Sequence, residues 1–411
     1  MGEYSGFIQN PLEVVQRLRN DLGDRYKRGF PVLKELIQNA DDAQATHVVF
    51  ALVQGLSEAR HPLLHGDALC IINNGRFEAK HDRGIRSYGL SNKVADRAAI
   101  GKFGLGMKSV FHFCEAFFFL GHIADRGPIA RIVNPWSVPE SLREEFASIH
   151  PSWEQFPPED ATAMLQAVAT ITKGLPTPHS DQPFALWLPL RREAHRREED
   201  KDTGVIVQEF PGDEDDSLSF FHDPRLPMQI ADVLPLLRHV EHVSFQPIAK
   251  DRYRPFHIEI SAPTQRLRGP TASGAHSLTG LIGIQVDGEA KTQAQFNGRE
   301  NHRWLDALKG LHQGPQWPET HHIDDLGNPK VEREKAEPHG SVVFTTSDAP
   351  VASGGHLTIR WAVFLPLEDD LVSETLFCGG DQDFSCTVVA HFISPADSRI
   401  ISRGMLAAFP H

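Results

Sequence analysis

Residues 35–43, ELIQNADDA, carry the pattern on which the fold assignment depends. Apolar residues recur around this stretch at helical spacing, at Leu33, Leu36, Ile37 and Ala40. This spacing predicts an amphipathic helix over about residues 30–45. At roughly 100° per residue, Glu35, Asn39 and Asp42 point almost the same way along its polar face. An acid, an amide and a second acid on one line raise the question of what they bind, although a solvated helix face is the simpler explanation of this stretch alone.

Two further short motifs follow in the chain. The first is IINNG, residues 71–75, at the end of a strand predicted over residues 68–72. The second is GKFGLG, residues 101–106, which predicts the glycine-rich start of a third helix. Taken alone, the first is typical of a hairpin turn and the second is a weak phosphate-loop pattern. The three motifs follow one another in this order, on a predicted helix, at a strand end and at a glycine-rich helix start. Together they are far more specific than any one of them alone.

Each motif suits a different part of a nucleoside triphosphate. The glycines of residues 101–106 let backbone N–H groups approach phosphate oxygens, next to the positive end of the following helix. The Asn39 amide oxygen is a neutral ligand for Mg²⁺ where phosphates already supply the negative charge. Glu35, one helical turn earlier, can accept a proton from an attacking water. Asn73 can accept the exocyclic amine of a base, and Gly75 leaves room for the ring.

With these motifs, the sequence resembles the ATP-binding domain shared by DNA gyrase B, the ninety-kilodalton heat-shock chaperones, histidine kinases and MutL. Within this superfamily it is most similar to the sacsin-type chaperone-like ATPases. The resemblance is carried by ELIQNADDA, by IINNGRF, by SNK at residues 91–93 and by IGKFGLGMKSVF at residues 100–111. It covers about residues 10–120 with specific motifs, and LWLPLRR and LPLLRHVEHV extend it to about residue 245.

The resemblance implies a role for each matching position. Glu35 corresponds to the general base, Asn39 to the Mg²⁺ ligand and Asp42 to an acidic residue beside the nucleotide. Asn73 falls at the adenine-binding position, and Lys93 lies near the lid lysine of the chaperones. The remaining nucleotide-binding positions are Gly75, Gly101, Lys102, Phe103, Gly104, Leu105 and Gly106. The implied cofactors are ATP and Mg²⁺.

Two departures from the family pattern affect the expected base-binding end. Asn73 replaces the usual Asp, and Phe77 stands where that motif has its second glycine. Asn can still accept a hydrogen bond from the adenine amine, but without charge assistance the bond is weaker. Pro183-Phe184 occupies the expected place of a late Gly-Thr segment, which leaves one nucleotide contact unassigned.

Arg299 is a second candidate catalytic residue. Related chaperones and gyrase place a basic side chain of the second domain against the terminal phosphate, where it stabilises charge in the transition state. Arg299 follows the Asn297-Gly298 pair, which is typical of a turn. A surface arginine paired with Glu300 explains the same pattern, and Lys291 is the next candidate for the catalytic role.

The patterns predict an α+β fold in two domains. Residues 1–190 are expected to form a two-layer α/β sandwich that binds ATP, and residues 226–411 a second α+β domain of the transducer or middle type. Residues 191–225 are expected to form an exposed charged connector, and an inserted exposed hairpin fits this stretch as well. Residues 73–100 are expected to form a polar loop. The expected strands are 46–53, 68–72, 116–121, 128–133, 166–172 and 184–190, then 240–247, 254–261, 277–286, 340–346 and 356–366.

The composition is that of an ordinary globular protein. The 411 residues are 40% hydrophobic and 23% charged, with a net charge of −13. No apolar run approaches the ~20 residues of a membrane span, and the N-terminus does not resemble a secretory signal. Four scattered cysteines fit a reducing cytoplasm. The negative charge argues against a broad nucleic-acid-binding surface, although a local basic patch remains open. His321-His322 followed by Asp324-Asp325 either binds a metal or is an ordinary polar loop.

These observations predict a cytoplasmic ATPase that acts as a chaperone-like clamp or conformational switch. Members of the resembling superfamily often bring two copies together, so we expect a homodimer or a partner protein on nucleotide binding, and no membrane. The alternative is a non-hydrolysing ATP-sensing scaffold subunit of a larger complex, such as one for antiviral defence in bacteria. Glu35 favours hydrolysis, because a pure sensor does not need a general base.

Overall fold

The structure is a computed structural model, and its chain divides into two compact units. The first unit is Met1–Ser91, Phe103–Leu226 and His242–Phe256, and the second is Asn92–Lys102, Pro227–Glu241 and His257–His411. The residues that the structure describes are 12–24, 29–86, 106–144, 146–176, 182–195, 205–207, 218–234, 237, 239–247, 253–261, 278–287 and 289–298, followed by the strands of residues 321–323, 329–331, 339–347, 356–362, 373–377 and 383–391.

A mixed sheet forms the centre of the first unit. Its strands, in sheet order, are β6 (His242–Gln246), β1 (His47–Val53), β2 (Ala68–Asn73), β5 (Phe184–Pro189), β3 (Phe117–Ile123) and β4 (Gly127–Val133). Strand β1 pairs in parallel with β6 and antiparallel with β2, and the other neighbours are antiparallel. Every residue of β2 and of β5 is buried, so both faces of the sheet are covered here. Continuous apolar runs such as these are typical of central strands.

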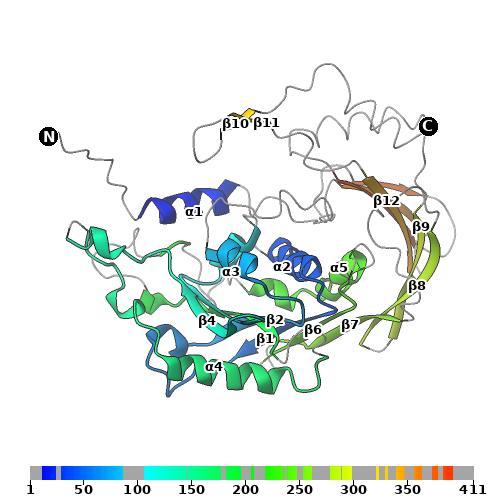
Figure 1. The fold of residues 1–411 in the computed structure, drawn as a ribbon. Helices are drawn as coiled ribbons and strands as arrows, with labels where there is room; N and C mark the ends of the chain where they lie inside the picture. Colours follow the sequence, from blue (N-terminus) through cyan, green and yellow to red (C-terminus); the bar gives the residue numbers. More distant parts are fainter. Residues whose placement is uncertain are drawn as a thin grey trace. The chain divides into compact units, whose positions relative to one another are not determined.

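Helices lie on both sides of this sheet (Figure 1). Helices α2 (Phe30–Asp42) and α3 (Ala79–Arg86) lie on one side, and α4 (Pro158–Ile171) lies on the other. Helix α1 is Glu13–Asp24, and Val15, Leu18 and Leu22 are its buried stripe. Short 3-10 helices complete the described part of the unit: η1 (Pro62–His65), η2 (Gly106–His112), η3 (Glu140–Leu142), η4 (Pro151–Trp153), η5 (Glu193–His195) and η6 (Ser219–His222).

The structure corrects several local predictions. Residues 166–172, predicted as a strand, belong mostly to helix α4, whose buried side chains Asp160, Met164 and Val168 follow the four-residue helical spacing. Residues 73–100 were predicted to form a polar loop, but this segment contains helix α3. After the glycine-rich motif the described helix is the 3-10 helix η2 rather than an α-helix.

The second unit is rich in strands. Its larger sheet, in order, is β14 (Ser373–Phe377), β13 (His356–Ala362), β15 (Asp383–His391), β12 (His339–Ser347), β9 (Glu289–Gly298), β8 (Leu278–Val286) and β7 (Phe256–Ser261), which enters the unit at His257. Helix α5 is Leu226–Val233, and a small antiparallel pair joins β10 (His321–Ile323) to β11 (Pro329–Val331). His321-His322 therefore lies in a strand, and Asn297-Gly298 closes β9 instead of forming a turn.

The predicted α+β fold is confirmed, with helices packed on a mixed sheet. Most predicted strands are present within a few residues of their expected ends. Among the described helices, none has the length and apolar character that crossing a membrane requires.

Candidate functional site

Helix α2 presents the acid–amide–acid face that the sequence predicted. Glu35, Asn39 and Asp42 are half-buried, each with interactions to neighbouring groups. A second polar line, which the sequence analysis missed, lies deeper on the same helix: Lys34, Gln38 and Asp41 are all buried. The same i, i+4, i+7 spacing, read one position earlier, could have found it. Helix α2 thus carries polar groups well into the unit.

The ends of α2 are fixed by backbone geometry. Gly29 precedes the helix with φ of 91°, a conformation that side chains disfavour, and Pro31 lies in the first turn. At the other end, the Ala43 N–H donates to the carbonyl oxygens of Asn39 and Ala40, at 3.2 and 3.1 Å. The apolar stripe between these ends is buried. A helix held in this way keeps its polar face in one position.

The strand end after β2 is fastened to the end of α2. The Arg76 N–H donates to the Ala43 carbonyl oxygen at 2.8 Å. A Cβ atom at Gly75 would lie 2.8 Å from the same oxygen, so glycine is required for this close approach. The space that glycine leaves at position 75 is therefore filled by the backbone of Ala43. The first and second predicted motifs are in direct contact.

The two neighbouring asparagines have different surroundings. Asn73, the last residue of β2, and Asn74, which follows it, are both buried. The Asn74 amide oxygen accepts hydrogen bonds from the N–H groups of Thr46 and His47, at 2.9 and 3.0 Å. Its amide nitrogen donates to the Thr46 hydroxyl and the Pro176 carbonyl oxygen, at 2.9 and 2.8 Å. Among the residues that the structure describes, Asn73 has one side-chain hydrogen bond, in which its amide oxygen accepts from the Gly75 N–H at 3.0 Å.

The third motif reaches α2 through η2, which begins at Gly106 and packs against α2. Lys108 of η2 is buried, and its ammonium group donates to the Ile85 carbonyl oxygen at 2.7 Å. Burial lowers the pKa of Lys108 to about 8. Of the other predicted site residues, Lys93, Gly101, Lys102, Phe103, Gly104, Leu105 and Arg299 lie outside the residues that the structure describes.

A buried ion pair, also missed by the sequence analysis, holds the segment after η2. Arg191 and Glu115 form this pair and are 1% and 0% exposed. The Arg191 guanidinium also donates to the carbonyl oxygens of Phe111, His112 and Cys114, at 2.6, 2.9 and 3.0 Å. The expectation of an exposed connector is therefore wrong at Arg191.

Glu115 extends this network to two further segments. Its carboxylate accepts from the Trp136 indole N–H at 3.1 Å and from the Ile206 N–H at about 3 Å. Val205 and Ile206 are buried as well, so the apolar break in the charged stretch 191–217 packs into the first unit. A charged carboxylate with several donors around it is the arrangement that buried charge requires.

Phe77 and Phe184, which both belong to the departures from the family pattern, contact each other. The rings of Phe77 and Phe184 stack, with centroids 4.7 Å apart and planes at 17°. Phe184 is the β5 partner of Asn73 in the strand register. A Cβ atom at Gly121 would meet the Phe77 ring at 2.8 Å. Phe77 therefore fills space beside the strand end where the family motif has a glycine.

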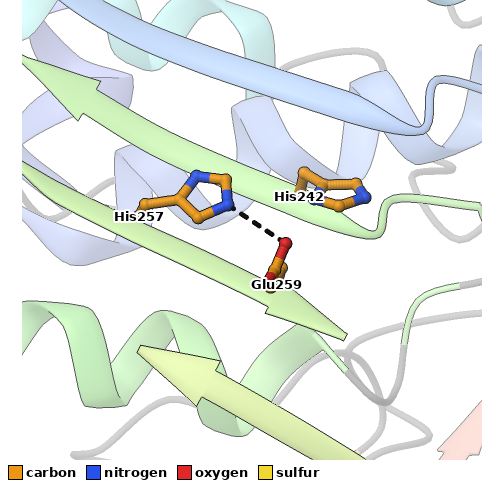
Figure 2. A group of neighbouring side chains, drawn as sticks. All are labelled: His242, His257 and Glu259. Carbon is orange, nitrogen blue, oxygen red and sulfur yellow. Dashed lines mark hydrogen bonds and ion pairs between the residues drawn. The ribbon is translucent and has the colours of Figure 1, made fainter. Parts of the chain in front are cut away.

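Figure 2 draws a separate polar group, which the sequence analysis did not name. In the second unit, His257 Nε2 and Glu259 Oε2 are 3.3 Å apart. His242, also drawn, belongs to the first unit, where its ring stacks on that of His47 with centroids 4.1 Å apart.

Comparison with known proteins agrees with the motifs that the structure brings together. The model of the Sacsin domain family matches residues 11–258. Human Sacsin is 36% identical to this chain over 113 residues, which are 26% of this chain. The chain spans only 2% of the length of that relative. Because the family model matches more than half of the residues, the chain belongs to the Sacsin domain family.

Proposed function

We propose that the first unit binds ATP with Mg²⁺ and hydrolyses it, and that the protein works as a chaperone-like, nucleotide-driven switch. The observation that carries the proposal is the position of α2. Its polar face is half-buried, its C-terminal end contacts the Asn73–Gly75 segment, and η2 packs against it. The membership of the Sacsin domain family and the resemblance to chaperone-type ATPases support the same reading.

The proposed chemistry assigns one task to each polar residue of α2. Asn39 would hold Mg²⁺, since a neutral oxygen ligand suits a cation already surrounded by phosphate oxygens. Glu35 lies one turn earlier, about 6 Å along the helix axis, and would accept a proton from the attacking water. Asp42 would lie beside the nucleotide, and Asn73 would contact the base. The bound Mg²⁺ would offset charge on the phosphates during transfer.

The rest of the proposed machinery lies on residues that the resemblance implies. Lys93 and the segment 101–105 would close over the phosphates, and Arg299 would stabilise the charge that develops during phosphoryl transfer. Nucleotide binding would then change the association of the protein with a second copy or with a partner.

The test combines binding and turnover in the full chain. We expect calorimetric titration to show ATP binding that depends on Mg²⁺, and a phosphate-release assay to show slow turnover. Glu35→Ala should keep ATP binding and slow turnover by about 10²–10⁴-fold, because a positioned base contributes that much. Glu58→Ala, which removes an exposed carboxylate elsewhere in the unit, is the matched control.

The outcomes separate the candidate functions. Binding with turnover that Glu35→Ala slows by about 10²–10⁴-fold, and that Glu58→Ala leaves unchanged, supports an ATPase. Binding without phosphate release, in both the wild type and the variant, supports the non-hydrolysing sensor instead. Absence of nucleotide binding contradicts both functions.

A further inference from the structure

Lys108 is a buried cation whose charge is not balanced by an acid. The residue is only 4% exposed, and its ammonium group donates to the Ile85 carbonyl oxygen at 2.7 Å. Among the residues that the structure describes, Lys108 forms no ion pair with a carboxylate, and its pKa is lowered by burial without any opposing contribution from a nearby charge. Buried charges are normally paired, so this ammonium group needs an explanation.

The contact with α3 does not balance the charge of Lys108. Ile85 lies in the last turn of α3, where the backbone carbonyl oxygens carry only a partial negative charge. Asp82, the buried carboxylate of the same helix, already pairs with Arg86 and Arg131, at 3.0 and 2.9 Å. These four side chains, one acidic and three basic, therefore carry an excess of positive charge.

The position of Lys108 connects this excess charge with the proposed nucleotide site. Lys108 lies two residues after Gly106, the last glycine of the third motif, in the helix η2 that packs against α2. Two residues span at most about 7 Å of chain. The glycines of this motif are the proposed neighbours of the phosphates, so a bound polyphosphate would lie close to a positive charge that the fold leaves unbalanced.

Lys108 also lowers the stability of the unit that contains it. A methionine side chain of similar length would fill the same space without a buried charge, so the fold alone does not require the ammonium group. Proteins keep such destabilising groups mainly at functional sites, where stability is lost in favour of binding or catalysis. A role in ligand binding accounts for a lysine at this position.

We infer that Lys108 is a specificity-determining residue, which strengthens binding in proportion to the negative charge of the ligand. This inference rests on the nucleotide site proposed above. The ammonium group is held by the Ile85 carbonyl oxygen and would act across the protein interior rather than by touching the ligand. At a separation of about 10 Å and an effective dielectric constant of about 20, each unit of ligand charge changes the affinity by on the order of tenfold.

The experiment compares adenosine, ADP and ATP, which carry progressively more negative charge. Their dissociation constants, with Mg²⁺ present, are measured by calorimetry on the full chain. Lys108→Met should weaken the binding of ATP most, weaken that of ADP less, and leave that of adenosine unchanged. The expected loss is on the order of tenfold for each unit of charge. If adenosine binds too weakly to measure, ADP and ATP still give the comparison.

Lys108→Gln separates the charge from the hydrogen bond. Its amide N–H can still donate to the Ile85 carbonyl oxygen, but the side chain is neutral. It should therefore show the same graded loss as Lys108→Met. Lys80→Met removes the same charge from a side chain of α3 that is 62% exposed, and it should leave all three constants unchanged. A thermal melt confirms that the variants are folded, and Lys108→Gln alone suffices if Lys108→Met is not.

The outcomes separate the inference from the proposed function. A loss that grows with ligand charge in the Lys108 variants, and is absent in Lys80→Met, supports the inference. No loss, an equal factor for all ligands, or a loss in Lys108→Met that Lys108→Gln does not share overturns the inference and leaves the nucleotide site standing. A wild type that binds neither ADP nor ATP overturns the inference together with the proposed function.

Discussion

Lys108 shows how a single buried residue couples stability to pH. The residue is only 4% exposed, and its ammonium group donates to the Ile85 carbonyl oxygen. Burial disfavours the charged form and lowers the pKa of Lys108 from 10.5 to about 8. Between these two values the folded state releases a proton that the unfolded state keeps. The free energy of unfolding therefore rises as pH increases through this window.

Replacing Lys108 by Met should remove this dependence. Below pH 8 both states of the wild type are protonated, so the burial penalty, on the order of 3 kcal/mol, is fully present. Lys108→Met should raise stability most at neutral pH and progressively less toward pH 10. Urea unfolding at several pH values measures the difference from the wild type. Lys80→Met, at an exposed lysine, is the control. If the free energy of unfolding of the wild type and of Lys108→Met changed with pH in the same way, the argument would be contradicted.

Asn39→Ala tests the proposed Mg²⁺ ligand. Loss of the amide oxygen should weaken Mg-ATP binding strongly, because the cation loses its direct protein ligand. The loss should be small in EDTA, where no cation bridges the phosphates. Titration of the full chain under both conditions gives the comparison. An equal loss in both would assign Asn39 to the fold of α2, and Asn20→Ala provides a surface control.

At the scale of elements, the pair of Glu115 and Arg191 holds η2 and its following residues. The bonds join groups 76 to 80 residues apart in sequence. Removing one partner leaves a buried charge without compensation, which typically costs about 3–5 kcal/mol. Arg191→Met should therefore reduce the free energy of unfolding by about this amount. The double variant Arg191→Met with Glu115→Gln should recover part of the loss.

Equilibrium urea unfolding measures both variants against an exposed pair. Arg225 and Asp223 form an ion pair in which the Arg225 side chain is 68% exposed. Arg225→Met should cost less than about 1 kcal/mol, since exposed pairs contribute little. If Arg191→Met cost no more than Arg225→Met, the buried network would not stabilise the unit as described.

The elements were predictable where a local pattern decides them. Helix α2 and strands β1, β2 and β5 follow from apolar spacing and from buried runs, and their predicted ends are close to those observed. The prediction of a strand over residues 166–172 was wrong, because a short apolar run with β-branched residues fits a strand as well as a buried helix. The Glu115–Arg191 ion pair could not be predicted from the sequence, because no local pattern shows which charged residues far apart in the chain form a pair.

At the scale of the whole molecule, the two units are interleaved along the sequence. Residues 242–256 return to the first unit, where β6 pairs in parallel with β1. Local patterns located the strand near residues 240–247 but not its partner, since parallel pairing joins segments far apart in the chain. The matched family segment, residues 11–258, includes this returning strand.

The proposed switch predicts a change of assembly on nucleotide binding. Glu35→Ala should hold ATP without consuming it, so the bound state should persist. Sedimentation velocity of this variant with Mg-ATP should show a larger species than without nucleotide, if a second copy is the partner. A species of unchanged size despite measured binding would exclude self-association and direct the search to another protein.

The hydrogen bonds around Asn74 also bear on the chemical ageing of the protein. Asn-Gly sequences such as Asn74-Gly75 are prone to deamidation, in which the glycine nitrogen attacks the side-chain carbonyl carbon. Here the Asn74 amide is held at both ends by Thr46, His47 and Pro176, away from the flexible geometry that the attack needs. Deamidation at this site then requires the strand end to open. The deamidation rate, measured by peptide mass mapping of stored protein, therefore reports how often the strand end opens. A ligand that stabilises the strand end should lower this rate.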